Sequence, residues 1–271
     1  VCCAWSCKAI RSARSVGYCV RPAMEQPAAA SAGGSEVAEQ QPGTKDITSP
    51  CYTFGIYVIL YAKDAESAPT AVRFLREHFQ RQLDGREPGA ITTTLVPPTA
   101  EEPTAIRLFE LWETAKDYAA HEVSEHLKLN TDNIRPYVDL DRTVLIKSDR
   151  VEHFSRQGFA GAPRVGIAVD FQLTDAEHAE QAMTFSREHF GRQHDGREPG
   201  ATSAAAFPPT EAEPTTVRYV EHWGTAEDYE AHNTSEHLKA HLANVGPMIA
   251  EGSLHIVKFA DAEQFDRASA S

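Results

Sequence analysis

Hydrophobic residues along this chain follow one pattern that occurs twice. Over residues 54–61 and again over 165–171, apolar side chains occupy every second position, which predicts a strand at the start of each copy. Both faces of the first strand are apolar, whereas the second strand carries Asp170 on one face. Over about 67–81, and in the matching stretch around 183–190, apolar residues recur at helical spacing and predict an amphipathic helix.

The residues after this helix predict a loop, two strands, a second helix and a closing strand. Gly and Pro in the sequence DGREPG end the first helix. Thr114 and Asp117 have capping-box spacing and mark the start of the second helix, which we expect to break near Ser124. The remaining strands of the first copy are expected at 90–96, 104–112 and 143–147, and the closing strand of the second copy at 253–259. Each copy is therefore predicted to be β-α-β-β-α-β.

The second half of this pattern is also repeated in its letters. Residues 107–128 read RLFELWETAKDYAAHEVSEHLK and residues 218–239 read RYVEHWGTAEDYEAHNTSEHLK, without insertions between the landmarks of the two copies. One structural unit has therefore been duplicated. The predicted organisation is an arm at 1–50, a first domain at 51–148, a linker at 149–163, a second domain at 164–260 and a tail at 261–271.

The expected fold class is α+β. Each copy should form an antiparallel sheet with helices on one face, so its other face needs a cover. Because Tyr57, Ile59 and Tyr61 on that face cannot remain in water, we expect the two sheets to pack face to face within one chain, as a pseudo-dimer. Further homo-oligomerisation is left open.

Composition narrows the classes of partner. The chain has 39 acidic and 26 basic residues and a formal charge of −13, so we expect no nucleic-acid partner. Apolar runs fall short of the roughly 20 residues that a membrane-spanning helix needs, so we expect no membrane partner. All five cysteines lie at or before Cys51, so a disulfide framework is not expected to support either copy.

The first residues leave the cellular compartment open. Residues 1–50 are rich in small and polar residues and are expected to form a disordered arm. Residues 1–23 contain basic residues and Ser but no acid, as a plastid or mitochondrial transit peptide would. The alternative is that Met24 is the true start, which would leave the protein in the cytoplasm.

Two carboxylates stand on an otherwise apolar strand face. Alternation places Glu110 beside Leu108 and Trp112, and Glu221 takes the same position in the second copy. Desolvation would raise the pKa of such a carboxyl and suit it to accept a proton. The alternative is a structural Glu held by hydrogen bonds, as most buried polar groups are.

An aromatic set follows the strand in both copies. It combines a Trp from the sheet with a Tyr and a His from the covering helix: Trp112, Tyr118 and His121, and then Trp223, Tyr229 and His232. These side chains could line a pocket for a flat aromatic ligand, or they could hold the helix to the sheet as core residues. Both interpretations stay open from the residues alone.

Each copy also contains a histidine pair, namely His121 with His126, and His232 with His237. A spacing of five points the two rings apart on a continuous helix, and the sequence shows no third ligand at a useful spacing. We therefore expect no metal site. His78 and His189 lie beside Phe residues on the first helices and are expected to be satisfied at the edge of the core.

The Glu-x-Trp strand, the Thr and Tyr after it, the His-x-x-Ser-x-His sequence and the preceding Arg-Glu-Pro-Gly loop resemble the antibiotic biosynthesis monooxygenase (ABM) domain in both copies. The resemblance implies ferredoxin-like units that pair as a dimeric α/β barrel. Some members oxidise polyketide-derived phenols, quinols or naphthols with neither metal nor flavin. Relatives include isomerases, haem-degrading enzymes and proteins without established catalysis.

The resemblance also suggests which residues line the pocket. The pocket Trp and Tyr of the polyketide-oxidising members correspond to Trp112 and Tyr118, and to Trp223 and Tyr229. Those members carry an Asn four residues before the Trp, where this chain has Leu108 and Tyr219.

The sequence thus predicts a cofactor-independent monooxygenase that oxidises a small phenolic or quinol molecule with O2, without cofactor or metal. Catalytic roles are expected for Trp112, Tyr118, His121, Trp223, Tyr229 and His232. Substrate-binding roles are expected for Leu108, Glu110, Tyr219 and Glu221. The alternatives are a non-catalytic ligand-binding or stress-related assembly module with the same fold, and an isomerase.

Overall fold

The computed structural model of the chain describes residues 51–155 and 165–267. The arm and targeting segment expected over 1–50 lie outside the described residues, as do 156–163 of the expected linker and residue 164. The first repeat contains β1 (Cys51–Ala62), α2 (Ala68–Arg81), β2 (Ala90–Val96), β3 (Ala105–Trp112), α3 (Ala115–Glu122), α4 (Glu125–Ile134) and β4 (Val138–Ser155). The second repeat contains β5 (Val165–Gln172), α5 (Ala179–Arg192), β6 (Ala201–Phe207), β7 (Thr216–Trp223), α6 (Ala226–Asn233), α7 (Glu236–Val245) and β8 (His255–Phe259), followed by β9 (Glu263–Asp266).

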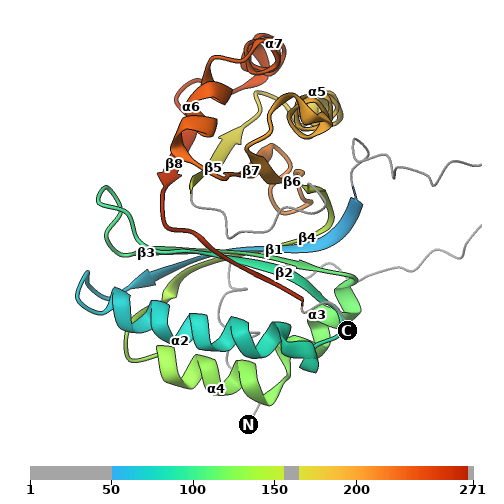
Figure 1. Ribbon diagram of the computed structural model, residues 1–271. Helices are drawn as coiled ribbons and strands as arrows, with labels where there is room; N and C mark the ends of the chain where they lie inside the picture. Colours follow the sequence, from blue (N-terminus) through green and yellow to red (C-terminus); the bar gives the residue numbers. More distant parts are fainter. Residues whose placement is uncertain (1–50, 156–164, 268–271) are drawn as a thin grey trace, which may run out of the picture. The chain divides into compact units, whose positions relative to one another are not determined.

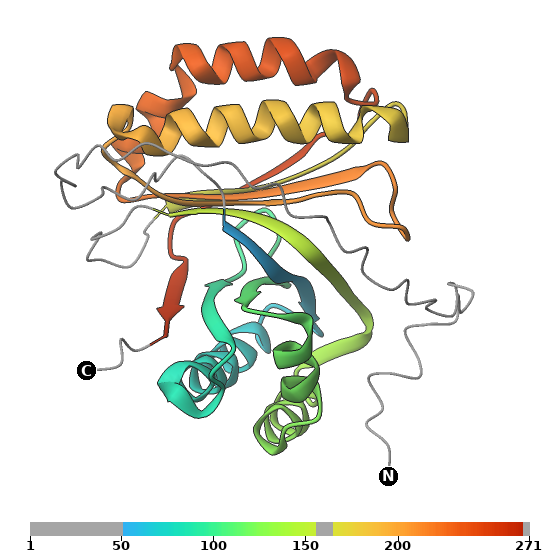
Figure 2. The same ribbon diagram turned by 90° about the vertical axis from the view of Figure 1, so that its right-hand side faces the viewer.

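The strands form one antiparallel sheet of nine strands in the order β8-β5-β7-β6-β4-β1-β3-β2-β9. In the first repeat, α2 and α4 lie side by side on one face of the strands, and α5 and α7 do the same in the second repeat (Figures 1 and 2). The α+β class and the βαββαβ order of each repeat are confirmed. The halves are joined by pairing of β4 with β6, in addition to side-chain packing.

The second helix breaks where the sequence predicts it. Thr114 caps α3 by accepting a hydrogen bond from the Asp117 backbone N–H at 3.2 Å. Ser124 then ends that helix and caps α4, accepting from the Leu127 N–H at 3.2 Å. The second repeat uses Thr225 and Ser235 in the same way.

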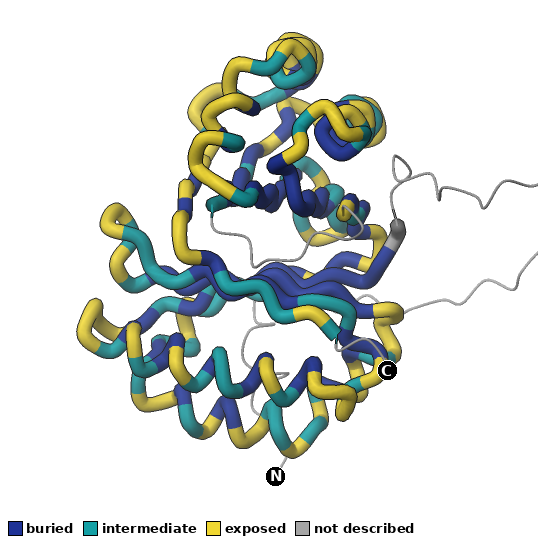
Figure 3. The backbone as a smooth tube through the Cα atoms, in the orientation of Figure 1, coloured by how far each residue is buried: buried dark blue, intermediate teal, exposed yellow. Residues whose placement is uncertain are grey.

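The hydrophobic core has three parts. Each repeat has one cluster between its helices and its strands. The cluster of the first repeat is built on Phe54, Ile56, Val58 and Leu60, as the alternation predicts. The third cluster lies on the opposite strand faces and draws side chains from both repeats: Tyr57, Phe109, Val151, Phe207, Val220 and Phe259 among others. Strand segments are accordingly buried, while the outer sides of the helices are exposed (Figure 3).

Two segments differ from the expected organisation. The strand expected at 143–147 runs over Val138–Ser155, so residues 149–155 of the expected linker are strand. Polar residues in this segment interrupt the alternation of apolar residues that would indicate a strand. Their partners come from the other repeat, as in the ion pair of Glu152 with Arg187 at 2.6 Å. The expected tail contains β9, which pairs with β2 and carries Phe265 against Phe79. The domain division as a whole stays a prediction.

A buried imidazole lies beside the shared third cluster. His222 is 3% exposed, lies 3.1 Å from the Ser203 hydroxyl, and has its ring 5.7 Å from that of Phe259. Burial, with a smaller contribution from the positive charge of His153, lowers the pKa of His222 to about 3. The folded chain therefore takes up this proton only at strongly acidic pH.

This imidazole should make the fold acid-sensitive. Below about pH 6.5 the unfolded chain binds the His222 proton and the folded chain does not, so the free energy of unfolding falls by up to about 1.4 kcal/mol per pH unit until about pH 3. We expect His222→Gln to reduce this slope in urea unfolding measured from pH 7 to 4.5. His255→Gln, at an exposed site, is the control; equal slopes for His222→Gln and the parent would contradict the assignment.

Candidate functional site

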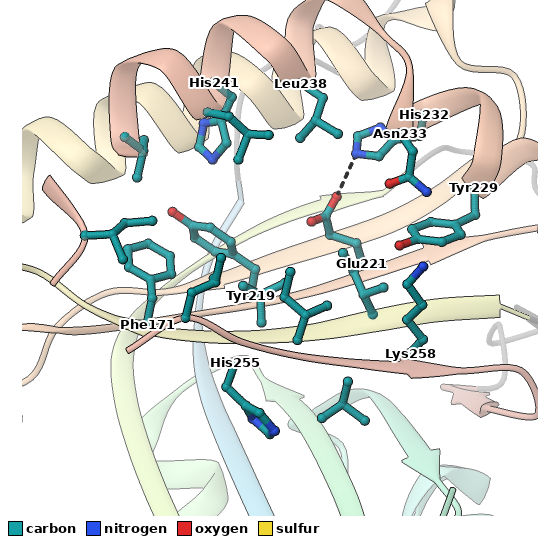
Figure 4. Close-up of a pocket in the computed structure, with 18 of the residues that line it drawn as sticks. Phe171, Tyr219, Glu221, Tyr229, His232, Asn233, Leu238, His241, His255 and Lys258 are labelled. Atoms are coloured by element: carbon teal, nitrogen blue, oxygen red, sulfur yellow. Dashed lines mark ion pairs between the residues drawn. The ribbon is translucent and has the colours of Figure 1, made fainter. Parts of the chain in front are cut away.

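The second repeat contains a cavity of about 720 Å³ between its sheet and its helices (Figure 4). Its walls come from β5, β7, β8, α5, α6 and α7, and from the connection between β2 and β3 of the first repeat. Apolar side chains supply most of the lining, including Ile167, Val169, Phe171, Leu238, Leu242 and Val245. A cavity of this size and character suits a drug-sized aromatic molecule.

Four residues predicted for the site line this cavity, namely Tyr219, Glu221, Tyr229 and His232. Trp223 is fully buried and is not among the lining residues. Its ring lies 5.0 Å from that of Tyr229 and 4.8 Å from that of His232. The Trp therefore supports the wall of this cavity from behind, because α6 brings its own Tyr and His in front of it.

The position of Tyr219 depends on a second residue that also differs between the repeats. Where the first repeat has Leu75 and Leu108, the second has Ser186 and Tyr219. The Ser186 hydroxyl donates to the Ala182 carbonyl and accepts a short hydrogen bond from the Tyr219 hydroxyl. Burial raises the pKa of Tyr219, so its hydroxyl stays protonated. The paired change satisfies a phenol that would otherwise be buried without a partner.

The two candidate carboxylates differ in their surroundings. Glu110 is buried and accepts hydrogen bonds from the Gln82 amide at 3.1 Å and the Trp112 indole at 3.2 Å. Glu221 faces the cavity, with Oε2 3.9 Å from Nε2 of His232 (Figure 4). Burial raises the pKa of both carboxyls. The first Glu thus fits the structural interpretation, and the second is available to a ligand.

The aromatic set of the first repeat packs as core. Trp112 lies 5.7 Å from the Tyr118 ring and 4.9 Å from the His121 ring, and all three are buried. Leu108 belongs to the same hydrophobic cluster as Trp112 and Tyr118. The catalytic roles expected for Trp112, Tyr118 and His121 and the substrate-binding role expected for Leu108 stay predictions.

A carboxylate from each Glu-Pro-Gly loop holds two histidines. Glu87 accepts from Nδ1 of His121 at 2.6 Å and lies 3.0 Å from Nδ1 of His126. Although burial alone would raise the pKa of Glu87, these histidines lower it to about 2. Glu198 lies 2.9 Å from Nδ1 of His232 and 3.1 Å from Nε2 of His237, and its pKa is also about 2.

The glycine of this loop allows the loop backbone to lie close to the first turn of the second helix. A Cβ on Gly89 would lie 2.1 Å from Cβ of Asp117, and a Cβ on Gly200 would lie 1.9 Å from Cγ of Asp228. The loop therefore touches the start of the second helix, which brings its Glu to the histidines at that helix's end. The repeated Arg-Glu-Pro-Gly sequence was the signal for this contact.

The expectation that the histidines point apart is wrong. The break at Ser124 turns His126 back toward His121, with ring centroids 5.2 Å apart. His78 from α2 joins them at 5.4 and 4.8 Å, and its Nδ1 is buried without a hydrogen-bond partner. It is therefore not the satisfied core-edge residue that its helical position suggested.

Sequence comparison identifies no matching family model and no matching curated protein. Among solved structures, a proposed monooxygenase from Lactobacillus acidophilus NCFM aligns with a TM-score of 0.64 and 14% identity over 79% of this chain and 100% of its own. A proposed monooxygenase from Fusobacterium nucleatum aligns with a TM-score of 0.68 and 10% identity over 80% and 96%. An anthrone oxidase-like protein aligns with a TM-score of 0.54 and 13% identity over 81% and 96%.

At these identities the likeness concerns the fold. In the described part of the chain, each helix is too short or too polar to cross a membrane. These alignments show that the chain shares its duplicated α+β fold with the solved structures.

The Tyr219 and Ser186 pair can be tested by a double-mutant cycle. We expect Tyr219→Phe and Ser186→Ala to show a coupling free energy of about 1 kcal/mol in urea unfolding, because each removes the same buried hydrogen bond. Tyr137→Phe with Ser186→Ala, which joins residues in different repeats, should be additive. Additivity of the first pair would contradict the bond.

Proposed function

We propose that the chain is a monooxygenase that oxidises a small phenolic or quinol substrate with O2 in the cavity of the second repeat. The observation that carries this proposal is a mainly apolar cavity with a hydroxyl, an ammonium and a carboxylate at defined places on its wall. The fold shared with proposed monooxygenases and an anthrone oxidase-like protein supports the reaction class.

The substrate ring is assigned to the apolar part of the cavity. Ile167, Val169 and Phe171 on β5 offer one flat wall, and Leu238 and Leu242 on α7 offer the other. Such walls contact both faces of an aromatic ring and exclude water from it. A reactive intermediate would therefore be shielded from hydrolysis.

The phenolic oxygen is assigned to Lys258 and Tyr229. The Lys258 ammonium lies 5.0 Å from the centroid of the Tyr229 ring, and both side chains line the cavity (Figure 4). A nearby positive charge favours the phenolate over the phenol, and the Tyr hydroxyl can donate to it. Glu221 and His232, at the polar part of the wall, would orient a second substrate oxygen.

The proposed reaction needs no external reductant. The phenolate gives one electron to O2, and the phenoxyl radical and superoxide then combine at a ring carbon that bears hydrogen. The peroxide takes up the proton that the phenol released, which gives a carbon-bound hydroperoxide. Loss of water then leaves a carbonyl on the ring, so one oxygen atom enters the product and the other leaves as water. The protein contributes orientation, phenolate stabilisation and a dry environment.

Turnover of dihydroxynaphthalenes in air, measured by oxygen uptake and by transfer of ¹⁸O from ¹⁸O2 into the product, tests this proposal. We expect turnover by the full chain and a drop in kcat/KM of about 100-fold in Lys258→Met, because the phenolate loses its charge partner. Each assay is run with and without a chelator.

The duplication supplies a matched control. Lys147 lies 4.9 Å from the Tyr118 ring in the first repeat, as Lys258 does from Tyr229 in the second. Lys147→Met should therefore leave turnover unchanged. Ligand binding without oxygen uptake in any assay would instead indicate a binding module, and conversion that proceeds equally without O2 would indicate an isomerase.

A further inference from the structure

Three histidines from separate helices meet in each repeat. In the first repeat, α2, α3 and α4 supply His78, His121 and His126; in the second, α5, α6 and α7 supply His189, His232 and His237. In each triad, one ring nitrogen per residue lies within 4.8 Å of the others. The triad is present twice although its surroundings differ, since Asn130 in the first repeat corresponds to His241 in the second.

A carboxylate orients two of the three rings. Because Glu87 faces Nδ1 of both His121 and His126, those nitrogens carry the protons and both Nε2 atoms are left as acceptors. A metal-binding His in proteins usually donates its other ring N–H to a carboxylate, a backbone carbonyl or a water molecule. In the second repeat Glu198 contacts Nδ1 of His232 and Nε2 of His237, which leaves Nε2 of His232 and Nδ1 of His237 as acceptors. The outer contacts of a metal site are therefore already formed.

Several polar atoms at these places are buried without a hydrogen-bond partner. They are Nδ1 of His78 and Nε2 of His126 in the first repeat, and Nδ1 of His189 and Oε2 of Glu221 in the second. Buried polar atoms almost always have a hydrogen-bond partner. Several unpartnered atoms near one triad therefore need an explanation. A bound cation would supply the missing partner to Nδ1 of His78, to Nε2 of His126 and to Oε2 of Glu221.

We propose that each histidine triad binds one divalent first-row transition-metal ion of the Zn²⁺ type. Zn²⁺ bonds to imidazole nitrogen are about 2.0–2.1 Å long, which places tetrahedral ligand atoms about 3.4 Å apart. Nitrogens that lie up to 4.8 Å apart must therefore approach by up to about 1.4 Å on binding. His126, with 18% of its side chain exposed, lies at the edge of its triad and has room to move.

The second site has a further ligand. Oε2 of Glu221 lies 3.9 Å from Nε2 of His189 and 3.9 Å from Nε2 of His232, so the carboxylate can complete the coordination. In the first repeat, Glu110 is held by Gln82 and Trp112 instead. His189 and His232 line the large cavity, whereas Glu198 and His237 line a groove of about 490 Å³ that offers a route to the ion.

The second site shares His232 and Glu221 with the proposed oxidation. Ion binding is measured without any substrate, so the two proposals are tested separately. Full-length protein freed of metal with a chelator is titrated with Zn²⁺ in a calorimeter, and with Co²⁺ while its visible absorption is recorded. We expect two ions per chain, one in His78→Ala, one in His189→Ala and none in the double variant. Glu87→Gln and Glu198→Gln should each weaken one site about 10- to 100-fold.

His255→Ala, at an exposed histidine outside both triads, is the control and should still bind two ions. Circular dichroism establishes that each variant is folded. If an alanine at a buried ring prevents folding, His126→Ala and His237→Ala remove a ligand from the rim of each triad. Absence of binding to the parent protein at 100 μM metal, or two ions bound by the folded double variant, would overturn the proposal.

Discussion

The rest of the structure depends on covering the second face of each sheet. Helices bury one face of the strands in each repeat, and the opposite face presents large apolar side chains such as Tyr57 and Phe109. Such a face is stable only when it is removed from water. Phe207 and Phe259 of the other repeat pack in the same cluster, and the Tyr57 hydroxyl donates to Asp170 across the repeats at 3.1 Å. One chain therefore supplies both halves of a pair.

When two repeats are joined in one chain, the residues of one repeat can differ from those of the other. The first repeat keeps Glu110 engaged by an amide and an indole, and packs Leu108 into its core. At the corresponding positions the second repeat has a Glu facing a cavity and a Tyr held by Ser186. Since each repeat has its own helix-facing core, these changes leave the shared cluster intact. The proposed oxidation belongs to the second repeat for this reason.

Local features could be predicted from the sequence, because their physical causes lie within a few residues. The strand faces follow from alternation, and the helix break follows from the capping position of Ser124. Partners distant in sequence could not be predicted in this way. Glu152 was assigned to a linker because its partner Arg187 belongs to the other repeat. His78 was assigned to the edge of the core because its contact with His126 depends on the helix break. The spacing of residues in the sequence therefore predicted only part of the site.

Cleavage between the repeats tests most directly whether each one covers the other. A protease site placed at 158–161 would allow the full chain to fold before it is cut. Sedimentation then measures whether the fragments remain together in native buffer. Packing through the shared cluster and pairing of β4 with β6 and of β2 with β9 predict one particle with the mass of the whole chain. Two separate, folded monomeric halves would contradict this account.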